Sequence, residues 1–408
     1  MKHLILTISV LLFSGLAYGQ EYEIDQAKIK EDLDEILTDL SHDYIYLSDK
    51  KVDLNCIRDY YEQQIPSLKT EEQVVLFFEY LLDEFYDSHL ILSTNRSSSY
   101  RLYSPVYASL QQGSPVITQV WQTQLKSLQI DLIGAEVVKM NGVDMDQVIE
   151  KFPTHCNNKN DEQVREWIVN KILAGRYNQP RVLTLKLANG ESTEMDLDQL
   201  EYRSNSALLT SSIENGVGVI RLNNSLGNGR LIDEFDQALN GLMNTEGLII
   251  DLRNTVDGGD SYIARAIMGH FIQELKPYQK HWSLEQYEEA PAVERSWTEF
   301  VSPRKDYYSK PVVILVGRWT GSMGEGLAIG FEGMGRAIIV GSEMERLAGE
   351  MNGYSFVHQN FGYRISTAKL FHIDGTPREE YVPENYVTQT TYQKDEVLEK
   401  GIELIKAR

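Results

Sequence analysis

The feature that most constrains the fold of this chain is a series of short apolar segments that alternate with helical stretches after residue 205. The apolar segments are residues 216–222, 247–252, 311–316 and 337–340, and the helical stretches between them are 231–242, 262–271 and 325–334. Strands that are apolar along their length are covered on both faces, because a strand with one face in water alternates apolar and polar residues. The alternation therefore predicts an α/β core in which helices pack on a β-sheet.

Two further regions precede this core. A chain of 408 residues exceeds what one hydrophobic core usually organises, so two or three domains are expected. Between residues 26 and 84, apolar residues at steps of three and four predict helices; they include Ile29, Leu33, Ile36, Leu37 and Leu40. Short β-like runs follow at residues 116–118, 130–132, 136–140 and 182–187. We predict a helical domain at 20–100, a β-rich domain at 101–200 and the α/β core at 201–408.

The first residues have the pattern of a secretory signal peptide. Lys2 supplies the positive start, residues 4–16 are largely apolar, and Ala17 and Gly19 occupy the positions where a signal peptidase needs small side chains. We therefore expect residues 1–19 to be removed and the mature chain to be periplasmic or secreted. No later stretch approaches the roughly 18 consecutive apolar residues of a membrane helix, so no membrane span is expected.

Composition excludes several classes of partner. The formal net charge of -21 disfavours nucleic acid and anionic membranes, because phosphate binding needs a basic surface, whereas a neutral or basic substrate is compatible. Cys56 and Cys156 are the only cysteines, and the sequence leaves open whether they pair in an oxidising compartment. The eight histidines lack metal-ligand spacing, and the glycine loop at residues 321–326 has no phosphate-binding lysine. Neither a metal nor a cofactor is expected.

One candidate nucleophile lies directly between an apolar strand and a helix, in Thr320-Gly321-Ser322-Met323-Gly324-Glu325. A serine at a strand-to-helix turn with flanking glycines can present its hydroxyl clear of the sheet. The next amide, of Met323, then points toward the attacked carbonyl and can stabilise the oxyanion. Taken alone, such a serine is more often a helix cap.

Two further segments support a catalytic role for Ser322. After the strand at residues 247–252, Gly258 and Gly259 lack side chains, so their amides can approach a substrate and supply a second oxyanion donor. The helical region ends in Asp87-Ser88-His89, where the histidine has the pKa suited to take and return a proton. The Ser88 hydroxyl can join the network that orients it. By itself His89 would more often be structural.

Together, in this order, the segments resemble the serine peptidase family that includes the C-terminal processing (tail-specific) proteases and the tricorn core protease. The resemblance includes a late Asp-Gly … Glu … Pro segment at residues 374–384, and it implies a crotonase/ClpP-like α/β core. Residues 134–143 resemble the turn of an embedded PDZ domain, which implies binding of an extended peptide by strand addition. The alternative is a β-rich domain that only positions its neighbours.

The chain departs from the family at two places. Processing proteases carry a general-base lysine after the strand that ends at Gly341, whereas residues 342–349 here contain none. The resemblance then implies the tricorn-like arrangement, in which Ser322 attacks, His89 is the base, and Ser88 and a glutamate complete the network. Glu379 fits better than Glu380, because Tyr381 then aligns with the family's Glu-x-Tyr.

The second departure concerns the oxyanion hole, which the resemblance assigns to Gly258 and Met323. Residues 254–257 interrupt the glycine run usual in the family, and this change is expected to affect rate, since one oxyanion donor contributes about a hundredfold or more.

These observations predict a periplasmic or secreted serine endopeptidase that hydrolyses extended or unfolded polypeptides through a Ser322 acyl-enzyme. A homo-oligomer is compatible with them. The alternative is a catalytically inactive protein that uses the same scaffold to bind peptides or partners. Retention of Ser322, Ser88, His89 and a late glutamate favours the enzyme, and the missing lysine with the altered loop favours the alternative.

Overall fold

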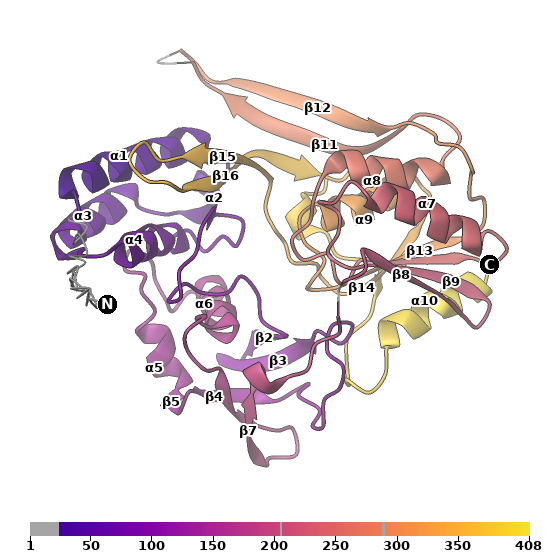
Figure 1. Ribbon diagram of the computed structural model, residues 1–408, viewed down its shortest axis with the longest axis horizontal. Coiled ribbons are helices and arrows are strands. Elements are labelled where there is room, and N and C mark those ends of the chain that lie inside the picture. Colours follow the sequence, from indigo (N-terminus) through magenta and orange to yellow (C-terminus); the bar gives the residue numbers. More distant parts are fainter. Residues whose placement is uncertain (1–23, 205, 288–289) are drawn as a thin grey trace, which may run out of the picture.

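The computed structural model describes residues 24–204, 206–287 and 290–408, so the predicted signal peptide lies outside the described residues. The chain passes from a group of helices, through a sheet with two helices, into a larger α/β region (Figure 1). Within the described residues, no helix has the length and apolar character that crossing a membrane requires.

The N-terminal region is helical, as predicted. Its elements are α1 (Gln26–Asp43), α2 (Leu47–Lys50), α3 (Leu54–Gln64), η1 (Ile65–Ser67) and α4 (Glu71–Asp83). Asp25 and Asp53 cap the first turns of α1 and α3, and Thr70 with Gln73 forms a capping box on α4. The apolar side of these helices is closed by residues from far along the chain, among them Phe356, Tyr363 and Ile365.

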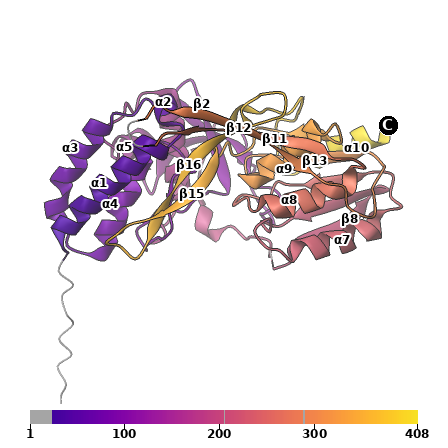
Figure 2. The same cartoon turned by 90° about the horizontal axis from the view of Figure 1, so that it is seen from above.

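Those residues belong to a returning hairpin, β15 (Glu350–Ser355) and β16 (Gly362–Phe371), which lies against the helices in both views (Figures 1 and 2). β16 also pairs with β1 (Ile91–Leu92) and with β11 (Lys276–Glu285), and β11 continues into a long hairpin with β12 (Val293–Val301). This sheet joins the N-terminal helices to the C-terminal half of the chain. The sequence patterns did not predict it.

The middle region is an antiparallel sheet in the order β2-β3-β4-β6-β7, with β5 beside β4. Its elements are β2 (Val106–Gln111), β3 (Ser114–Val120), β4 (Glu136–Met140), β5 (Val143–Asp144), α5 (Met145–Glu150), α6 (Glu162–Ala174), β6 (Val182–Lys186), β7 (Ser192–Asp196) and η2 (Leu197–Gln199). The predicted turn at Asn141-Gly142 is present, with positive φ at both residues. The predicted strand at residues 130–132 is wrong, because this segment is irregular and contributes Leu132 to the core from a loop.

A disulfide joins Cys56 on α3 to Cys156 after α5, with the two Cα atoms 5.7 Å apart. It connects the N-terminal helices covalently to the middle region.

The C-terminal region contains the predicted α/β core. Its six-stranded sheet has the order β17-β14-β13-β10-β9-β8, in which only β8 is antiparallel to its neighbour. Its strands are β8 (Leu209–Glu214), β9 (Val217–Leu222), β10 (Leu248–Asp251), β13 (Val312–Val316), β14 (Ile338–Gly341) and β17 (Asn385–Tyr386). Its helices are α7 (Leu231–Leu242), α8 (Ser261–Met268), η3 (Gly269–Phe271), α9 (Met323–Gly333), η4 (Arg378–Glu380) and α10 (Glu396–Lys406).

Both faces of this sheet are covered, which explains why its strands are apolar along their length. Helices α7, α8 and α9 pack on one face with Ile220, Ile250 and Ile314, whereas α10 packs on the other with Ile249 and Val313. Figure 1 shows this layering. Since the strands are parallel, the loops that follow β10 and β13 emerge at the same edge of the sheet, where the candidate site lies.

Candidate active site

Ser322 occupies the turn between β13 and α9 in a strained backbone conformation. Its φ is 47° and its ψ is -113°, outside the regions that non-glycine residues ordinarily adopt. It is half-buried, and Met323 after it is the first residue of α9. The amides of a first helical turn have no partner within the helix, so the Met323 N–H is suited to bind an oxyanion.

The loop after β10 packs directly against this turn. The Thr255 carbonyl accepts hydrogen bonds from Gly321 N at 3.2 Å and from Gly258 N at 2.9 Å. Gly258 has φ +65°, and a Cβ built on it would lie 2.4 Å from Ser322 Cβ and 2.7 Å from Met323 N. Only glycine fits there. The structure thus brings the two predicted oxyanion residues, Gly258 and Met323, into contact.

The Gly258 amide is nevertheless engaged within its own loop. This N–H donates to the Thr255 carbonyl and closes a turn at residues 255–258, so the amide is not free in this structure. The turn contains three of the residues that interrupt the glycine run, Thr255, Val256 and Asp257. Of the two predicted donors, Met323 therefore has the N–H whose position in the helix leaves it available.

His89 is buried, and its two ring nitrogens differ in protonation and in hydrogen bonding. Nδ1 lies 2.9 Å from the Ala348 carbonyl oxygen, and because a carbonyl only accepts, Nδ1 must carry the proton. Nε2 is buried without a hydrogen-bond partner among the described residues. Burial is the main cause that lowers the pKa of His89 to about 4, so the ring is neutral near pH 7. A neutral ring with an available Nε2 lone pair is the form that a general base requires.

Glu325 joins the nucleophile turn to the segment that holds His89. Its buried carboxylate accepts from Ser322 N at 2.9 Å, from Arg346 N at 2.9 Å and from Leu347 N at 3.2 Å. Burial raises the pKa of Glu325 to about 7, against the opposing effects of Arg378 and the three amides. Residues 345–349, which we call the connecting segment, therefore contact both the serine turn, through Glu325, and the histidine, through Ala348.

Arg378 supports the connecting segment from the other side. It is 2% exposed, and its Nη2 donates to the carbonyls of Leu347, at 2.8 Å, and of Gly349, at 3.1 Å. Roles for Glu325, Arg378 and Ala348 did not follow from the sequence patterns. The Ser-x-x-Glu spacing of a capping box was a signal for Glu325, whereas a backbone carbonyl such as that of Ala348 has no sequence signature.

In this structure, neither Ser88 nor Glu379 is hydrogen-bonded to the His89 ring. Ser88 is exposed, and its hydroxyl accepts a hydrogen bond from Trp167 Nε1 at 3.1 Å. Glu379 is half-buried, unlike the exposed Glu380, and burial raises its pKa while the neighbouring Tyr46 hydroxyl opposes that shift. Neither forms a hydrogen bond with the ring, since Nδ1 is held by a backbone carbonyl and Nε2 has no partner. Their catalytic roles stay a prediction.

A cavity of about 870 Å³ opens beside the nucleophile turn. All three regions line it, and the lining residues include Ser88, Tyr103, Trp167, Trp319 and Glu345. Burial and the nearby carboxylates of Glu325 and Asp257 raise the pKa of Glu345 well above its usual value. Within the described residues, no group of three or more His, Cys, Asp or Glu side chains is placed to hold a metal ion.

A parallel sheet covered by helices, with a strained serine at a helix N-terminus and a histidine linked to the same turn, defines an α/β serine hydrolase. Residues 216–388 match the model of peptidase family S41, and residues 25–83 match the model of the tricorn protease C1 domain. Residues 216–388 thus form a domain of the S41 peptidase type, and the two matches together indicate that the chain is a serine peptidase. No curated protein sequence matches it.

Solved structures share the fold over nearly the whole chain. Mature CPAF complexed with lactacystin has a TM-score of 0.62 at 13% identity, and the alignment covers 94% of this chain and 97% of that one. The photosystem II D1 C-terminal processing protease has a TM-score of 0.55 at 14% identity, with 88% and 93% covered. A putative peptidase from Parabacteroides merdae has a TM-score of 0.52 at 13% identity, with 92% and 96% covered. At these identities the likeness is one of fold.

Proposed function

We propose that this chain is a secreted or periplasmic serine endopeptidase that acts on extended polypeptides, with Ser322 as the nucleophile and His89 as the general base. The observation that carries the proposal is the link between the two residues. Ser322 N bonds the Glu325 carboxylate, Glu325 bonds the amides of the connecting segment, and the Ala348 carbonyl of that segment orients His89. A helix-capping serine would not need a neutral histidine at the other end of this chain of hydrogen bonds.

In the proposed reaction, His89 Nε2 takes the proton from the Ser322 hydroxyl as Oγ attacks the scissile carbonyl. The oxyanion is stabilised by the Met323 N–H, aided by the positive N-terminus of α9. The proton passes to the leaving amine as the peptide bond breaks, and water then hydrolyses the acyl-enzyme by the same steps in reverse. Nε2 has no partner at rest, so its hydrogen bond to Oγ forms when substrate binds.

The cavity beside the nucleophile turn supports a polypeptide substrate, because it is lined by all three regions of the chain. We propose that the middle sheet acts as a PDZ-like domain and holds an extended peptide by strand addition. The net charge of -21 favours neutral or basic chains as substrates. The disulfide between Cys56 and Cys156 supports an oxidising location, since such bonds are rare in reducing cytosol.

A second candidate function, peptide binding without catalysis, is favoured by one observation: the Gly258 amide is engaged with Thr255 in this structure. A fluorophosphonate probe separates the two candidates. If the chain is an endopeptidase, we expect covalent labelling at Ser322 and cleavage of an unfolded protein. Both should be lost in Ser322→Ala and reduced about a thousandfold or more in His89→Ala. Absence of both label and cleavage in the folded wild-type protein would establish the binding function instead.

A further inference from the structure

The loop at residues 254–257 has three buried side chains, those of Asn254, Thr255 and Val256, although it lies beside the candidate site. Asn254 is 2% exposed and Val256 is 3% exposed. The Asn254 Oδ1 accepts two hydrogen bonds, from Trp121 Nε1 at 2.8 Å and from Thr123 Oγ1 at 2.6 Å. Both donors follow β3 of the middle sheet. The residues that replace the family's glycines are thus used to attach this loop to a different region of the chain.

The nucleophile turn is attached to the middle region through the same tryptophan. The rings of Trp121 and Trp319 are stacked, with centroids 5.2 Å apart and planes at 4°. Trp319 directly precedes the turn at residues 320–322, and its indole N–H donates to the Ser104 carbonyl at 2.9 Å. Trp121 also donates to the Arg253 carbonyl at 3.0 Å. One side chain of the middle region therefore contacts both loops that surround Ser322.

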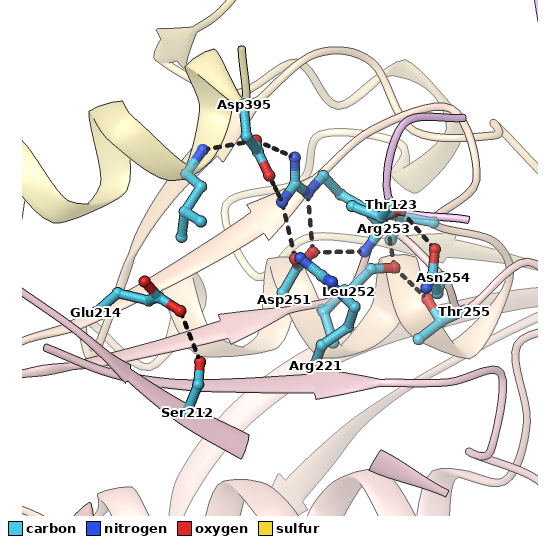
Figure 3. Close-up of polar contacts among 12 residues, drawn as sticks. Thr123, Ser212, Glu214, Arg221, Asp251, Leu252, Arg253, Asn254, Thr255 and Asp395 are labelled. Atoms are coloured by element: carbon cyan, nitrogen blue, oxygen red, sulfur yellow. Dashed lines mark hydrogen bonds and ion pairs between the residues drawn. The ribbon is translucent and has the colours of Figure 1, made fainter. Parts of the chain in front are cut away.

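The residue that precedes the 254–257 loop is anchored within the core. The Arg253 guanidinium bonds Asp251 at 2.8 and 2.9 Å and Asp395 at 2.6 and 2.9 Å, next to the start of α10 (Figure 3). Figure 3 also shows Thr123 directed at Asn254 on the side opposite this anchor. Within the core, the Thr255 hydroxyl donates to the Leu252 carbonyl at 2.8 Å and the Asp257 N–H donates to Asn224 Oδ1 at 2.9 Å, so the middle region acts on this loop through Asn254.

We propose that Trp121, Thr123, Asn254 and Trp319 form an interdomain clasp that positions the loop at residues 254–257 against the nucleophile turn. They are positioning residues, which act by holding Gly258 beside the Met323 amide. The inference rests on the proposed role of Ser322. Reacting groups displaced by about 1 Å lose on the order of a hundredfold in rate, so a clasp of this kind affects acylation strongly while leaving substrate binding in the cavity intact.

The test compares the rate of Ser322 labelling by a fluorophosphonate, and kcat and KM on a peptide substrate, across matched variants. Trp121→Phe removes the indole donor but keeps an aromatic ring, and Thr123→Val keeps the shape but removes the hydroxyl. We expect labelling and kcat to fall about 10- to 100-fold in Trp121→Phe and by a smaller factor in Thr123→Val, with KM within about twofold. Trp282→Phe is the matched control, since Trp282 lies on the projecting hairpin, and it retains the wild-type rates.

A spectroscopic measurement shows whether the clasp has opened. Stacked indoles couple their electronic transitions, so wild type and Trp282→Phe give an exciton signal in circular dichroism that Trp319→Phe and Trp121→Phe lose. Wild-type labelling rates in Trp121→Phe and Thr123→Val would overturn the inference. The four residues would then only hold the regions together, with no effect on the reaction of Ser322. Failure of the wild-type protein to label at all would instead overturn the role of Ser322.

Discussion

At the scale of single residues, the site depends on groups whose protonation is set by burial. His89 is neutral because burial lowers its pKa to about 4, and Glu325 titrates near neutrality because burial raises its pKa to about 7. Arg378 and the carboxyl of Glu345 also face Glu325, with opposite effects on its charge. The two residues that the connecting segment links, Glu325 and His89, therefore titrate in separate ranges of pH.

The titration of Glu325 near pH 7 predicts how the labelling rate of Ser322 falls at acidic pH. Ionised Glu325 accepts three amide hydrogen bonds, whereas the protonated form loses one acceptor oxygen, so labelling of Ser322 should fall as the pH drops below about 7. His89 stays neutral until about pH 4 and does not contribute to this fall. In Glu325→Gln the labelling rate should be lower and nearly independent of pH between about 5 and 8. Labelling that follows the ordinary histidine pKa of about 6.5 in both proteins would contradict this assignment.

Gly258 should tolerate no side chain. In Gly258→Ala, the new Cβ meets Ser322 Cβ at 2.4 Å and the backbone must keep a φ of +65°. We expect labelling of Ser322 to fall by about a hundredfold or more, measured as the second-order rate with the fluorophosphonate. Gly241→Ala is the matched control, because Gly241 lies on α7 with open space at its Cβ position. That variant should label normally and gain a few tenths to about 1 kcal/mol in stability.

At the scale of elements, the returning hairpin β15–β16 completes the core of the N-terminal helices. Phe356 is 4% exposed, and its ring lies 4.3 Å from that of Phe78 on α4 and 4.7 Å from that of Tyr363. The same hairpin begins directly after the connecting segment that holds His89. The packing of the helices and the position of the base are therefore linked.

Phe356→Ala tests this link. Removing a buried phenylalanine typically costs about 3–5 kcal/mol, so the free energy of unfolding should fall by this amount in chemical denaturation. Labelling of Ser322 should fall as well, because the helices that precede the turn of His89 are less firmly held. Val357→Ala, at a position of the same hairpin that is 72% exposed, serves as the control and should change neither quantity by much. Full stability in Phe356→Ala would show that the helices do not need the hairpin.

At the scale of the whole molecule, covalent and non-covalent links hold the regions around the cavity. The disulfide closes a loop of 100 residues between α3 and the middle region. In the chain-entropy model a loop of this length contributes about 4.7 kcal/mol, and measured values are commonly about 2–5 kcal/mol. The Cys56→Ser, Cys156→Ser double variant should therefore unfold at a lower denaturant concentration. Its free energy of unfolding should be lower by roughly 2–5 kcal/mol.

Reduction of the wild-type protein is the companion measurement, since it should reproduce the same loss without a substitution. A reduced protein as stable as the oxidised one would contradict the expectation.

Several local features were predictable. The helix at residues 231–242 and the buried strands β10 and β13 follow from apolar spacing, and the Ser322 turn follows from glycines placed between a strand and a helix. The strand expected at residues 130–132 was wrong, because apolar residues in a loop can also reach a core. Strand β16 was not predicted, since its partners β1 and β11 lie far away in the sequence.

The amino-acid sequence by itself determined the α/β core and the nucleophile turn, because the hydrophobic periodicity and the glycines that specify them act over a few residues. Tertiary structure alone decided that His89 is held by the carbonyl of Ala348, 259 positions away, and that Asn254 is held by Trp121, 133 positions away. No local sequence pattern indicates which residue will bond to a backbone carbonyl or to a buried side-chain amide. Only the packing of three regions around one cavity brings them together.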